Sequence, residues 1–269
     1  MDESKKLKEL VIEENVKVHR EEASVYEKIH PQLFNWYHNA KSWNDINFLF
    51  SLMDLRTGLR VLDLGCGTGF LTTKMLQKKN ADIIAVDLSK DMLMQLEKKL
   101  SSFPQGGRVA LINKEATAFL QGDNTRYDLI TASAFLHHLT DIKELLDLII
   151  KNLKPSGLFY IAYEPLKQPI DSKLQFALHR FFRTLDVAFF NVYLKMLGLK
   201  IDVSHEKSIA DYQTTLGGVD PVAIIGHLKG KGEILRFDKF ATRAFGIFAF
   251  ILDKMVKSQN TFSIIFRKS

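Results

Sequence analysis

The sequence predicts an α/β fold built around a mostly parallel sheet. Five short apolar runs between residues 60 and 163 alternate with segments of helical periodicity, and a glycine-rich turn follows the first run. Strands that alternate with helices pair in parallel through right-handed crossovers. The chain has 269 residues, of which 46% are hydrophobic and 25% charged. This is ordinary composition for one large globular domain or two small ones.

Residues 1–57 are predicted to form a helical lid at the N-terminus. Residues 1–25 have the composition of a charged helix. Pro31 stands where the first turn of a further helix would begin, a position that suits proline. Another helix is predicted from about Asn44 to Leu55, because Thr57-Gly58 is a typical helix end.

The α/β core is predicted over residues 58–165. Helical patterns lie between its five strands, which are the apolar runs at residues 60–64, 82–87, 109–113, 127–132 and 158–163. The last of these helices is expected from about Ile142 to Leu153, and the turn Lys154-Pro155-Ser156-Gly157 ends it.

Beyond residue 165 the alternation breaks, and residues 166–230 are predicted to form a helical cap insertion. An unusually long helix is expected over residues 173–197, with polar residues on one face and a broad apolar side elsewhere. That apolar side contains Leu174, Leu178, Phe181, Leu185, Phe189 and Val192. A second, shorter helix is predicted around Pro221 to Leu228.

Residues 231–269 are predicted to return to the core and complete the sheet. Two strands are expected near residues 233–240 and 261–267, with a very apolar helical insertion at 244–256 between them. We expect this insertion and the cap to line a pocket for an apolar substrate. Two alternatives stay open: the long helix completes the core or a dimer interface, or it lies on an anionic bilayer.

The positive charge is concentrated in the C-terminal part of the chain. Residues 1–166 hold 21 Lys/Arg and 22 Asp/Glu, whereas residues 167–269 hold 16 and 9, together with 12 of the 20 Phe. Anionic lipid, RNA or a large negative substrate would each suit such a region, as would a solvated surface over a well-filled core. Nucleic acid is disfavoured, because no RNA-binding module is recognisable and there is little interleaving of basic and aromatic residues on one strand.

Several classes of protein are excluded. Cys66 is the single cysteine, which excludes a disulfide scaffold and cysteine-rich metal centres and suits a reducing compartment. The longest apolar run, Ala244 to Leu252, has nine residues, against the roughly 18 that a membrane helix needs. The N-terminus does not resemble a secretory signal. We therefore expect a cytoplasmic protein, with peripheral membrane contact as the alternative, and no bound metal.

The strongest local signal is the turn Leu62-Asp63-Leu64-Gly65-Cys66-Gly67-Thr68-Gly69. Glycines between a strand and a helix allow the backbone to approach a ligand closely and to direct amide groups at it. The Gly-x-Gly-x-Gly spacing differs from the dinucleotide-binding fingerprint. Asp63 precedes the first glycine by two residues and suits an ammonium group better than a pyrophosphate. Cys66 is expected to pack structurally.

Together with later motifs, this turn resembles the class I S-adenosylmethionine-dependent methyltransferases over roughly residues 58–165. The later motifs are Val86-Asp87-Leu88-Ser89, Glu115-Ala116, Tyr127-Asp128-Leu129-Ile130, Phe135-Leu136-His137-His138 and Leu153-Lys154-Pro155-Ser156-Gly157. The resemblance implies S-adenosylmethionine as cofactor. It also implies a Rossmann-like, seven-stranded, mostly parallel sheet whose last strand is antiparallel, with the helical insertions added to it.

The resemblance also implies which residues bind the cofactor. The methionine part corresponds to Asp63, Gly65, Gly67 and Gly69. Asp87 would bind the ribose hydroxyls, Leu88 and Met92 would flank the adenine, and Glu115 with Ala116 would contact its edge. Family members more often have Asp at the position of Glu115. Ser133 at the end of the fourth strand and Tyr26 in the lid complete the predicted set.

Methyl transfer from a sulfonium is an in-line displacement, in which positioning and desolvation do most of the work. His137 and His138 are the candidate bases, with His138 favoured, since a neutral imidazole suits deprotonation of a hydroxyl. The alternative is that they cap a helix or pack structurally. Tyr163 and Glu164 are lesser candidates.

The expected acceptor is a small or lipid-like molecule, methylated at oxygen or carbon. The fourth strand ends in Thr131-Ala132-Ser133-Ala134 and lacks the Pro-Pro motif with which related enzymes hold a planar amine or amide. The carboxylates of the metal-dependent catechol type are missing as well. Three alternatives remain: an RNA methyltransferase, a non-catalytic protein that binds the cofactor or scaffolds a partner, and, more remotely, a dinucleotide-dependent reductase.

Overall fold

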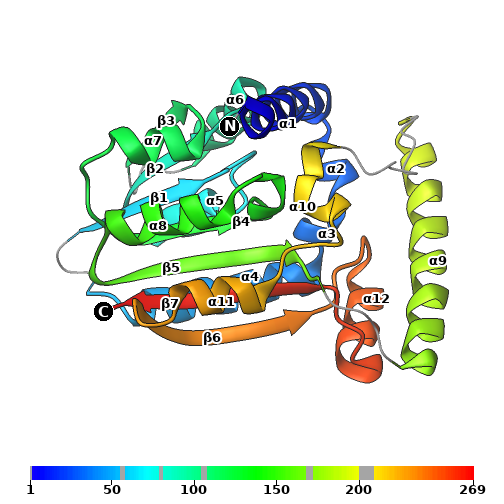
Figure 1. The fold of residues 1–269 in the computed structure, drawn as a ribbon. Coiled ribbons are helices and arrows are strands. Elements are labelled where there is room, and N and C mark those ends of the chain that lie inside the picture. The colour runs from blue at the N-terminus through cyan, green and yellow to red at the C-terminus, as the bar shows by residue number, and fades with distance from the viewer. Residues whose placement is uncertain (1, 55–57, 79–80, 104–107, 168–171, 200–208) are drawn as a thin grey trace.

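A seven-stranded sheet forms the centre of the protein (Figure 1). The computed structural model describes residues 2–54, 58–78, 81–103, 108–167, 172–199 and 209–269. The strands are β1 (Leu59–Leu64), β2 (Ala81–Asp87), β3 (Arg108–Asn113), β4 (Tyr127–Ser133), β5 (Leu153–Pro165), β6 (Gly232–Phe240) and β7 (Thr261–Lys268). Their order is β3-β2-β1-β4-β5-β7-β6. The pairs from β3 to β5 are parallel, and β7 is antiparallel to both of its neighbours. The predicted fold class is confirmed.

Helices precede, separate and follow the strands. Up to β5 they are α1 (Asp2–Glu22), α2 (Tyr26–Ile29), α3 (Pro31–Phe34), α4 (Trp36–Ser51), α5 (Thr72–Leu76), α6 (Lys90–Leu100), α7 (Ala116–Gly122), the 3₁₀ turn η2 (Leu136–His138) and α8 (Ile142–Asn152). After β5 come α9 (Lys173–Met196), the 3₁₀ turn η3 (Ile209–Asp211), α10 (Tyr212–Thr215), α11 (Pro221–Leu228), α12 (Gly246–Phe250) and the π-helix η4 (Ile251–Val256).

Two hydrophobic layers cover the two faces of the sheet. On one face α7, α8 and α11 pack against the strands, with residues such as Ile149 and Phe159 fully buried. On the other face α3, α4 and α5 do the same, around residues such as Leu49 and Tyr160. Burying a side chain of this size stabilises the fold by about 1.5–3 kcal/mol. This packing fixes the sheet edge at which the strands end.

Some helix bounds differ from those predicted. α4 begins at Trp36, earlier than the predicted Asn44, because the Asn35 side chain accepts a hydrogen bond from the His38 N–H (3.1 Å) and caps the helix there. The apolar segment 244–256 forms α12 followed by the π-helix η4. α8 and α11 lie within one residue of the predicted positions.

α9 lies along one side of the molecule, beside α12 (Figure 1). Its inner face holds Phe190 and Leu194, which pack against Ile29 of α2 in one hydrophobic cluster. The predicted apolar side does not complete the core, since Leu174, Phe181, Phe189 and Val192 are exposed. Within the described ranges, no helix combines the length and apolarity that crossing a bilayer requires.

Candidate functional site

A cavity opens at the carboxyl ends of β1, β2 and β4, which is where open α/β sheets bind ligands. α1, α2 and α3 supply its outer wall. It brings together the predicted residues Tyr26, Asp63, Gly65, Gly67, Asp87, Leu88, Met92, Glu115, Ala116, Ser133 and His138. Gly69 and His137 are not part of its lining.

Asp87 ties the end of β2 to the glycine turn. One of its carboxylate oxygens accepts a hydrogen bond from the Gly67 N–H (2.7 Å), and the other accepts one from the Ser89 N–H (2.8 Å). Burial raises the pKa of Asp87, and these two hydrogen bonds oppose the rise. Each carboxylate oxygen has a second lone pair, so the group can also accept hydrogen bonds from the hydroxyl groups of a ligand.

Asp63 lies deeper, at the end of β1, and is 2% exposed. Its two oxygens accept hydrogen bonds from the hydroxyls of Thr72 (2.5 Å) and Thr131 (2.7 Å). Burial raises the pKa of Asp63 to about 6, although both threonines lower it. A cation in the cavity would favour the ionised form of this carboxylate.

The three glycines of the turn have positive φ angles, of +63° at Gly65, +52° at Gly67 and +88° at Gly69. A Cβ atom at Gly65 would lie 2.3 Å from the Phe135 ring, and one at Gly69 would lie 2.3 Å from Leu96 of α6. A Cβ at Gly67 meets nothing within 4 Å. Gly67 therefore faces open space beside the cavity, whereas Gly69 allows α6 to pack closely.

The predicted adenine side of the cavity follows β2 and β3. Glu115 caps α7, because its side chain accepts a hydrogen bond from the Ala118 N–H (3.2 Å). Lys8 of α1 forms an ion pair with Glu115 at 3.3 Å and donates to the Thr117 hydroxyl at 3.3 Å. Met92 is buried in the first turns of α6. The contacts of Lys8 with Glu115 and Thr117 connect α1 to the core beside the cavity.

Two further features lie at the end of β4. The Ser133 hydroxyl is buried and has no hydrogen-bond partner within the described part of the chain. Ala134 has a φ of +48°, a conformation that costs a non-glycine residue about 1–2 kcal/mol. An unsatisfied buried hydroxyl and a strained backbone residue commonly mark a binding site.

His137 points away from the cavity toward Glu164, a fully buried carboxylate on β5. Its Nδ1 lies 2.9 Å from Glu164 Oε2. Glu164 also accepts the backbone N–H groups of Phe135 (2.8 Å) and Leu136 (2.8 Å). Burial would lower the pKa of His137, but the hydrogen bond and charge of Glu164 outweigh it and raise that pKa. Glu164 thus ties His137 to the backbone of the segment after β4, and the predicted catalytic role of His137 stays a prediction.

His138 lines the cavity, and its Nδ1 lies 2.8 Å from the backbone carbonyl oxygen of Ala210 in η3. Burial, reinforced by the charges of His137 and His19, lowers the pKa of His138 well below its usual value. The neutral imidazole therefore carries its proton on Nδ1 and donates it to Ala210, which leaves Nε2 unprotonated.

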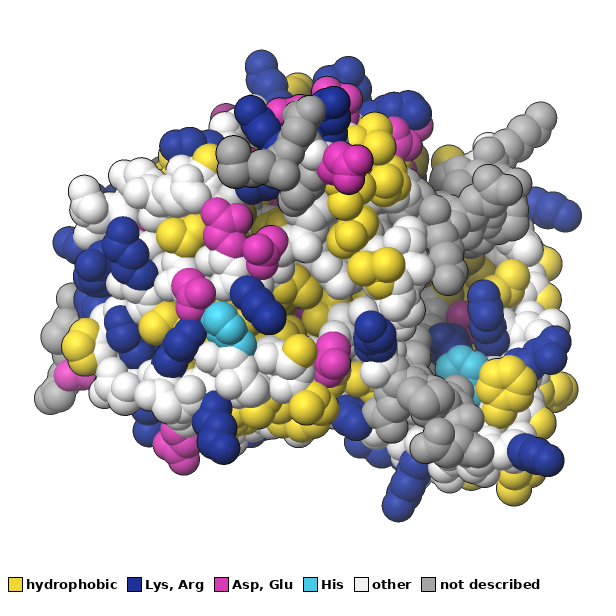
Figure 2. All heavy atoms as spheres, viewed as in Figure 1, with side chains coloured by type: hydrophobic (Ala, Val, Ile, Leu, Met, Phe, Trp, Pro, Cys, Tyr) yellow, Lys and Arg dark blue, Asp and Glu magenta, His cyan; other side chains and the backbone are white. Residues whose placement is uncertain are grey.

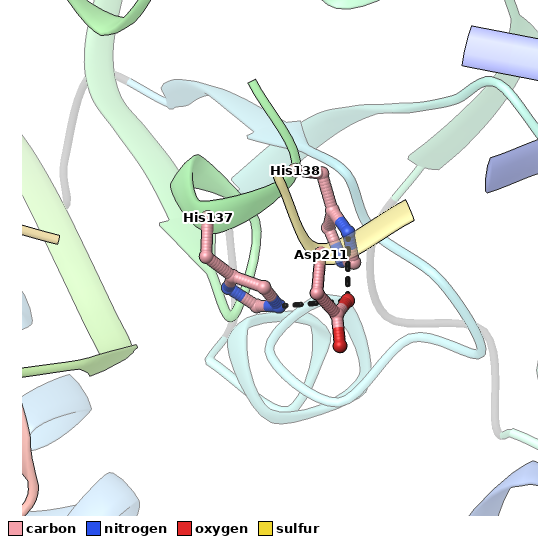
Figure 3. A group of neighbouring side chains, drawn as sticks. All are labelled: His137, His138 and Asp211. Carbon is pink, nitrogen blue, oxygen red and sulfur yellow. Dashed lines mark ion pairs between the residues drawn. The ribbon is translucent and has the colours of Figure 1, made fainter. Parts of the chain in front are cut away.

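Asp211, which belongs to the cap, lies close to both histidines. Its Oδ1 lies 3.8 Å from His137 Nε2 and 3.3 Å from His138 Nδ1, and both rings point toward it (Figure 3). Ligand atoms of the three residues lie within 4.8 Å of one another, close enough to hold a cation. One nitrogen of each ring already has a partner, since His137 Nδ1 pairs with Glu164 and His138 Nδ1 donates to the carbonyl of Ala210. The expectation of no metal stays a prediction.

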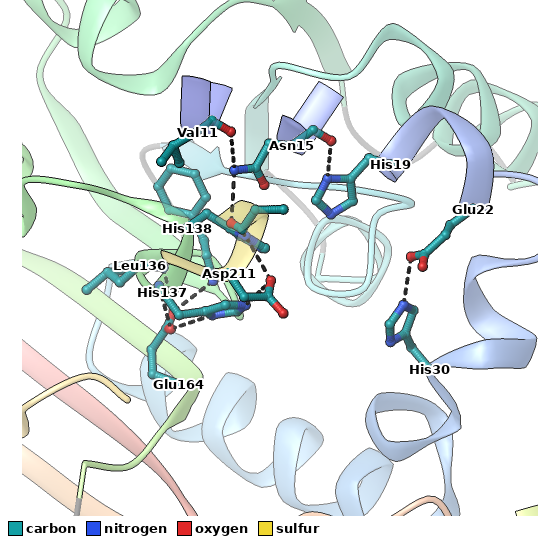
Figure 4. A network of polar contacts seen from close by, with 12 residues as sticks. Val11, Asn15, His19, Glu22, His30, Leu136, His137, His138, Glu164 and Asp211 are labelled. Atoms are coloured by element: carbon teal, nitrogen blue, oxygen red, sulfur yellow. Dashed lines mark hydrogen bonds and ion pairs between the residues drawn. The ribbon is translucent and has the colours of Figure 1, made fainter. Parts of the chain in front are cut away.

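The lid contributes residues that sequence reasoning missed. Asn15 of α1 donates its amide to the carbonyl of Ala210 at 3.0 Å, and the His19 ring stands edge-on to His138 at 5.3 Å (Figure 4). Asn15 and His19 both line the cavity, with Val11, Ile12 and Val16. Tyr26 lies nearby, and burial and the charges of Glu22, Asp87 and Asp211 raise its pKa. The sequence carries no signal for Asn15 and His19 beyond the charged composition of residues 1–25.

The cap differs from the expectation in one respect. Along the chain, Glu144 is the last described residue that lines the cavity. The described residues of the cap and of the 244–256 segment therefore do not form its walls. The cap instead reaches the site through Ala210 and Asp211, which hold His138.

Comparison with known proteins gives matches to methyltransferases. Residues 61–157 match the family model of the methyltransferase domain. The ubiquinone/menaquinone biosynthesis C-methyltransferase UbiE of Cronobacter sakazakii is 32% identical over 133 residues, 46% of this chain and 53% of that protein. The ubiquinone biosynthesis O-methyltransferase of Aliivibrio fischeri is 27% identical over 129 residues, 48% of this chain and 53% of that protein. The chain thus spans about half the length of these relatives.

A solved structure agrees with the fold over nearly the whole chain. The magnesium protoporphyrin IX methyltransferase of Synechocystis, determined with bound SAH, has a TM-score of 0.54 at 15% identity. The match covers 95% of this chain and 100% of that one. The strand order and the solved structure agree on the fold, which is that of class I methyltransferases. Within it, residues 61–157 match the methyltransferase domain.

Proposed function

We propose that this protein transfers the methyl group of S-adenosylmethionine to a small apolar acceptor, at oxygen or carbon. The observation that carries the proposal is the cavity, whose lining brings together the Asp63 and Asp87 carboxylates and the glycine turn. Relatives whose names specify ubiquinone and menaquinone biosynthesis support a quinone-like acceptor.

The residues of the cavity suit this cofactor. Two carboxylates in the lining favour a ligand that carries a sulfonium and an ammonium group over one that carries phosphates. Asp87 retains lone pairs for two ribose hydroxyls, and the Ser133 hydroxyl lacks a partner in the described chain. When bound, S-adenosylmethionine supplies an activated methyl group whose sulfur leaves as a neutral thioether.

His138 is the residue that we propose as the base. The carbonyl of Ala210 holds its Nδ1–H, so the Nε2 lone pair is free to accept a proton from the acceptor. As the new carbon–oxygen or carbon–carbon bond forms and the methyl–sulfur bond breaks, the acceptor's proton passes to Nε2. In this proposal His137 does not touch the acceptor, because Glu164 holds it outside the lining of the cavity, and it serves to position the segment that carries His138.

The walls opposite the carboxylates suit an apolar acceptor. Leu33 and Phe34 of α3 and Phe135 after β4 line the same cavity, together with the apolar side chains of α1. Apolar walls with a few convergent polar groups are typical of small-molecule sites. Closure by α1 would also exclude water from the methyl group.

The proposal is tested by labelled-methyl transfer into a fractionated cell extract. We expect label in the lipid and small-molecule fractions, in a quinone precursor or another apolar ring compound, and a large loss of label with His138→Ala. Label recovered in RNA would replace this proposal with an RNA methyltransferase. Tight cofactor binding without transfer into any fraction would favour a non-catalytic binding protein.

A further inference from the structure

α9 presents an apolar stripe that is largely exposed, although the Phe189 ring stacks on Phe248 of α12 with 6.0 Å between the ring centroids. Leu174, Phe181, Phe189, Val192 and Met196 are 69%, 57%, 56%, 55% and 82% exposed. Residues at these spacings share one face of a helix. Contiguous exposed apolar surface of this kind marks an interaction site on a folded protein.

The orientation of α9 is fixed by its opposite face. Phe190 and Leu194 are 5% and 2% exposed and belong to the hydrophobic cluster with Ile29. Asp186 accepts backbone hydrogen bonds from Ala244 (3.1 Å) and Phe245 (3.0 Å) before α12. The exposed stripe is therefore a second apolar face, and it borders α12 through Phe189, whose ring lies near those of Phe245 and Phe248.

The exposed charges of α9 have a single sign. α9 contains four basic residues, Lys173, Arg180, Arg183 and Lys195, and all four are exposed. Its one acidic residue is Asp186, which is buried in the contact with α12. Figure 2 shows hydrophobic and Lys/Arg side chains next to one another on the side of the molecule where α9 lies.

The neighbouring elements extend this surface. α12 and η4 pack beside α9, and Ile247, Phe250 and Met255 on them are 51%, 38% and 73% exposed. Lys254 and Lys257 stand beside these apolar residues in the sequence. α9, α12 and η4 thus each expose large apolar side chains, and α9 and η4 also contain basic residues. Their exposed apolar and basic residues together are from here on called the α9 surface.

We propose that the α9 surface docks onto an anionic lipid bilayer. A bilayer surface offers an apolar interior for the stripe and negative headgroups for the flanking lysines and arginines, whose long chains reach up to the headgroups. A second copy of the chain fits less well, because two such helices would bring only basic charges together. Docking would present the enzyme to acceptors dissolved in the membrane, but it does not depend on which acceptor is used.

Flotation of the full chain with lipid vesicles tests this inference. Vesicles of two parts phosphatidylcholine to one part phosphatidylglycerol are compared with vesicles of phosphatidylcholine alone, at low salt. The double variant Phe181→Glu/Phe189→Glu changes two exposed residues, so the fold should be retained, as circular dichroism and the melting temperature will show. Val222→Glu, at a 75% exposed residue on α11, is the matched control.

We expect the wild type and Val222→Glu to float with the anionic vesicles and the double variant to lose about tenfold or more of this binding. High salt should weaken binding, because the electrostatic part is screened. Wild type that stays unbound at low salt overturns the proposal. A double variant that floats normally, or that only converts a dimer to a monomer in analytical ultracentrifugation, overturns it too.

Discussion

The carboxylate of Asp87 accepts the backbone N–H of Gly67 at 2.7 Å, which joins the end of β2 to the middle of the glycine turn. One acid thereby shapes the turn and faces the cavity that the turn borders. Loss of this side chain would affect the binding of a ligand both directly and through the turn.

Asp87→Ala should weaken the binding of S-adenosylmethionine by about 10- to 150-fold, because hydrogen bonds to a charged acceptor are worth about 1.5–3 kcal/mol. Isothermal titration calorimetry measures this directly. Asp82→Ala is the control, since Asp82 lies at the other end of β2 and forms an exposed ion pair with Arg108 at 3.1 Å. Equal affinity in both variants would count against the assignment of Asp87.

Gly67→Ala should weaken cofactor binding about tenfold or more, since the added methyl group would stand in open space beside the ligand. Gly230→Ala is a matched control, because Gly230 has a φ of +79° and also meets nothing within 4 Å. Both variants should lose about 1–2 kcal/mol of stability from the left-handed backbone. A loss of cofactor affinity in Gly67→Ala no larger than in Gly230→Ala would remove Gly67 from the site.

Cofactor affinity should depend on pH through Asp63. Its pKa in the free protein is raised to about 6, so the carboxyl takes up a proton as the pH falls through that value and loses its attraction for a cation. We expect about tenfold weaker binding at about pH 5 than at about pH 8. Asp63→Asn should bind weakly with a flat profile in calorimetric titrations. A wild type with equal affinity at both pH values contradicts the assigned role.

His138→Ala should lower kcat by about 10²- to 10⁴-fold, the usual contribution of a general base. The affinity for S-adenosylmethionine should change little, because the proton that His138 accepts belongs to the acceptor. His227→Ala, a surface histidine paired with Asp147 at 2.8 Å, should keep full activity. Steady-state kinetics with the identified acceptor provide the readout, and an unchanged kcat in His138→Ala would exclude it as the base.

Chelation of divalent cations should leave methyl transfer unchanged. Glu164 and the carbonyl of Ala210 already hold the Nδ1 atoms of His137 and His138. Activity is measured after exhaustive dialysis against a chelator and again after a divalent cation is returned. Activity lost on chelation and restored by the cation would show that His137, His138 and Asp211 hold a metal.

The sequence predicted the core well because the relevant signals are local. Apolar runs and helical periodicity between residues 59 and 163 depend on neighbouring residues, and so does the glycine turn. Asp63 and Asp87 reach the cavity because each stands at the end of a parallel strand, and the carboxyl ends of parallel strands share one edge of the sheet. The local pattern places Asp63 and Asp87 at strand ends, and the parallel topology brings those ends to one edge of the sheet. Both residues could therefore be assigned to the cavity from the sequence.

The remaining features depend on long-range packing. His137 and His138 are adjacent, yet a 3₁₀ turn directs one to Glu164 and the other to the cavity. The roles of Asn15 and His19 follow from where α1 crosses the core. The periodicity of α9 predicted an apolar face, but it contains no information on whether another element covers that face.

Calorimetric titration of the wild-type protein with S-adenosylmethionine tests the central claim most directly, with NADH and ATP as comparison ligands. We predict saturable binding of S-adenosylmethionine at one site, weakened about 10- to 150-fold in Asp87→Ala and unchanged in Asp82→Ala, and no binding of the phosphate-bearing ligands. No heat of binding from S-adenosylmethionine, or tight binding of NADH in its place, would contradict the account.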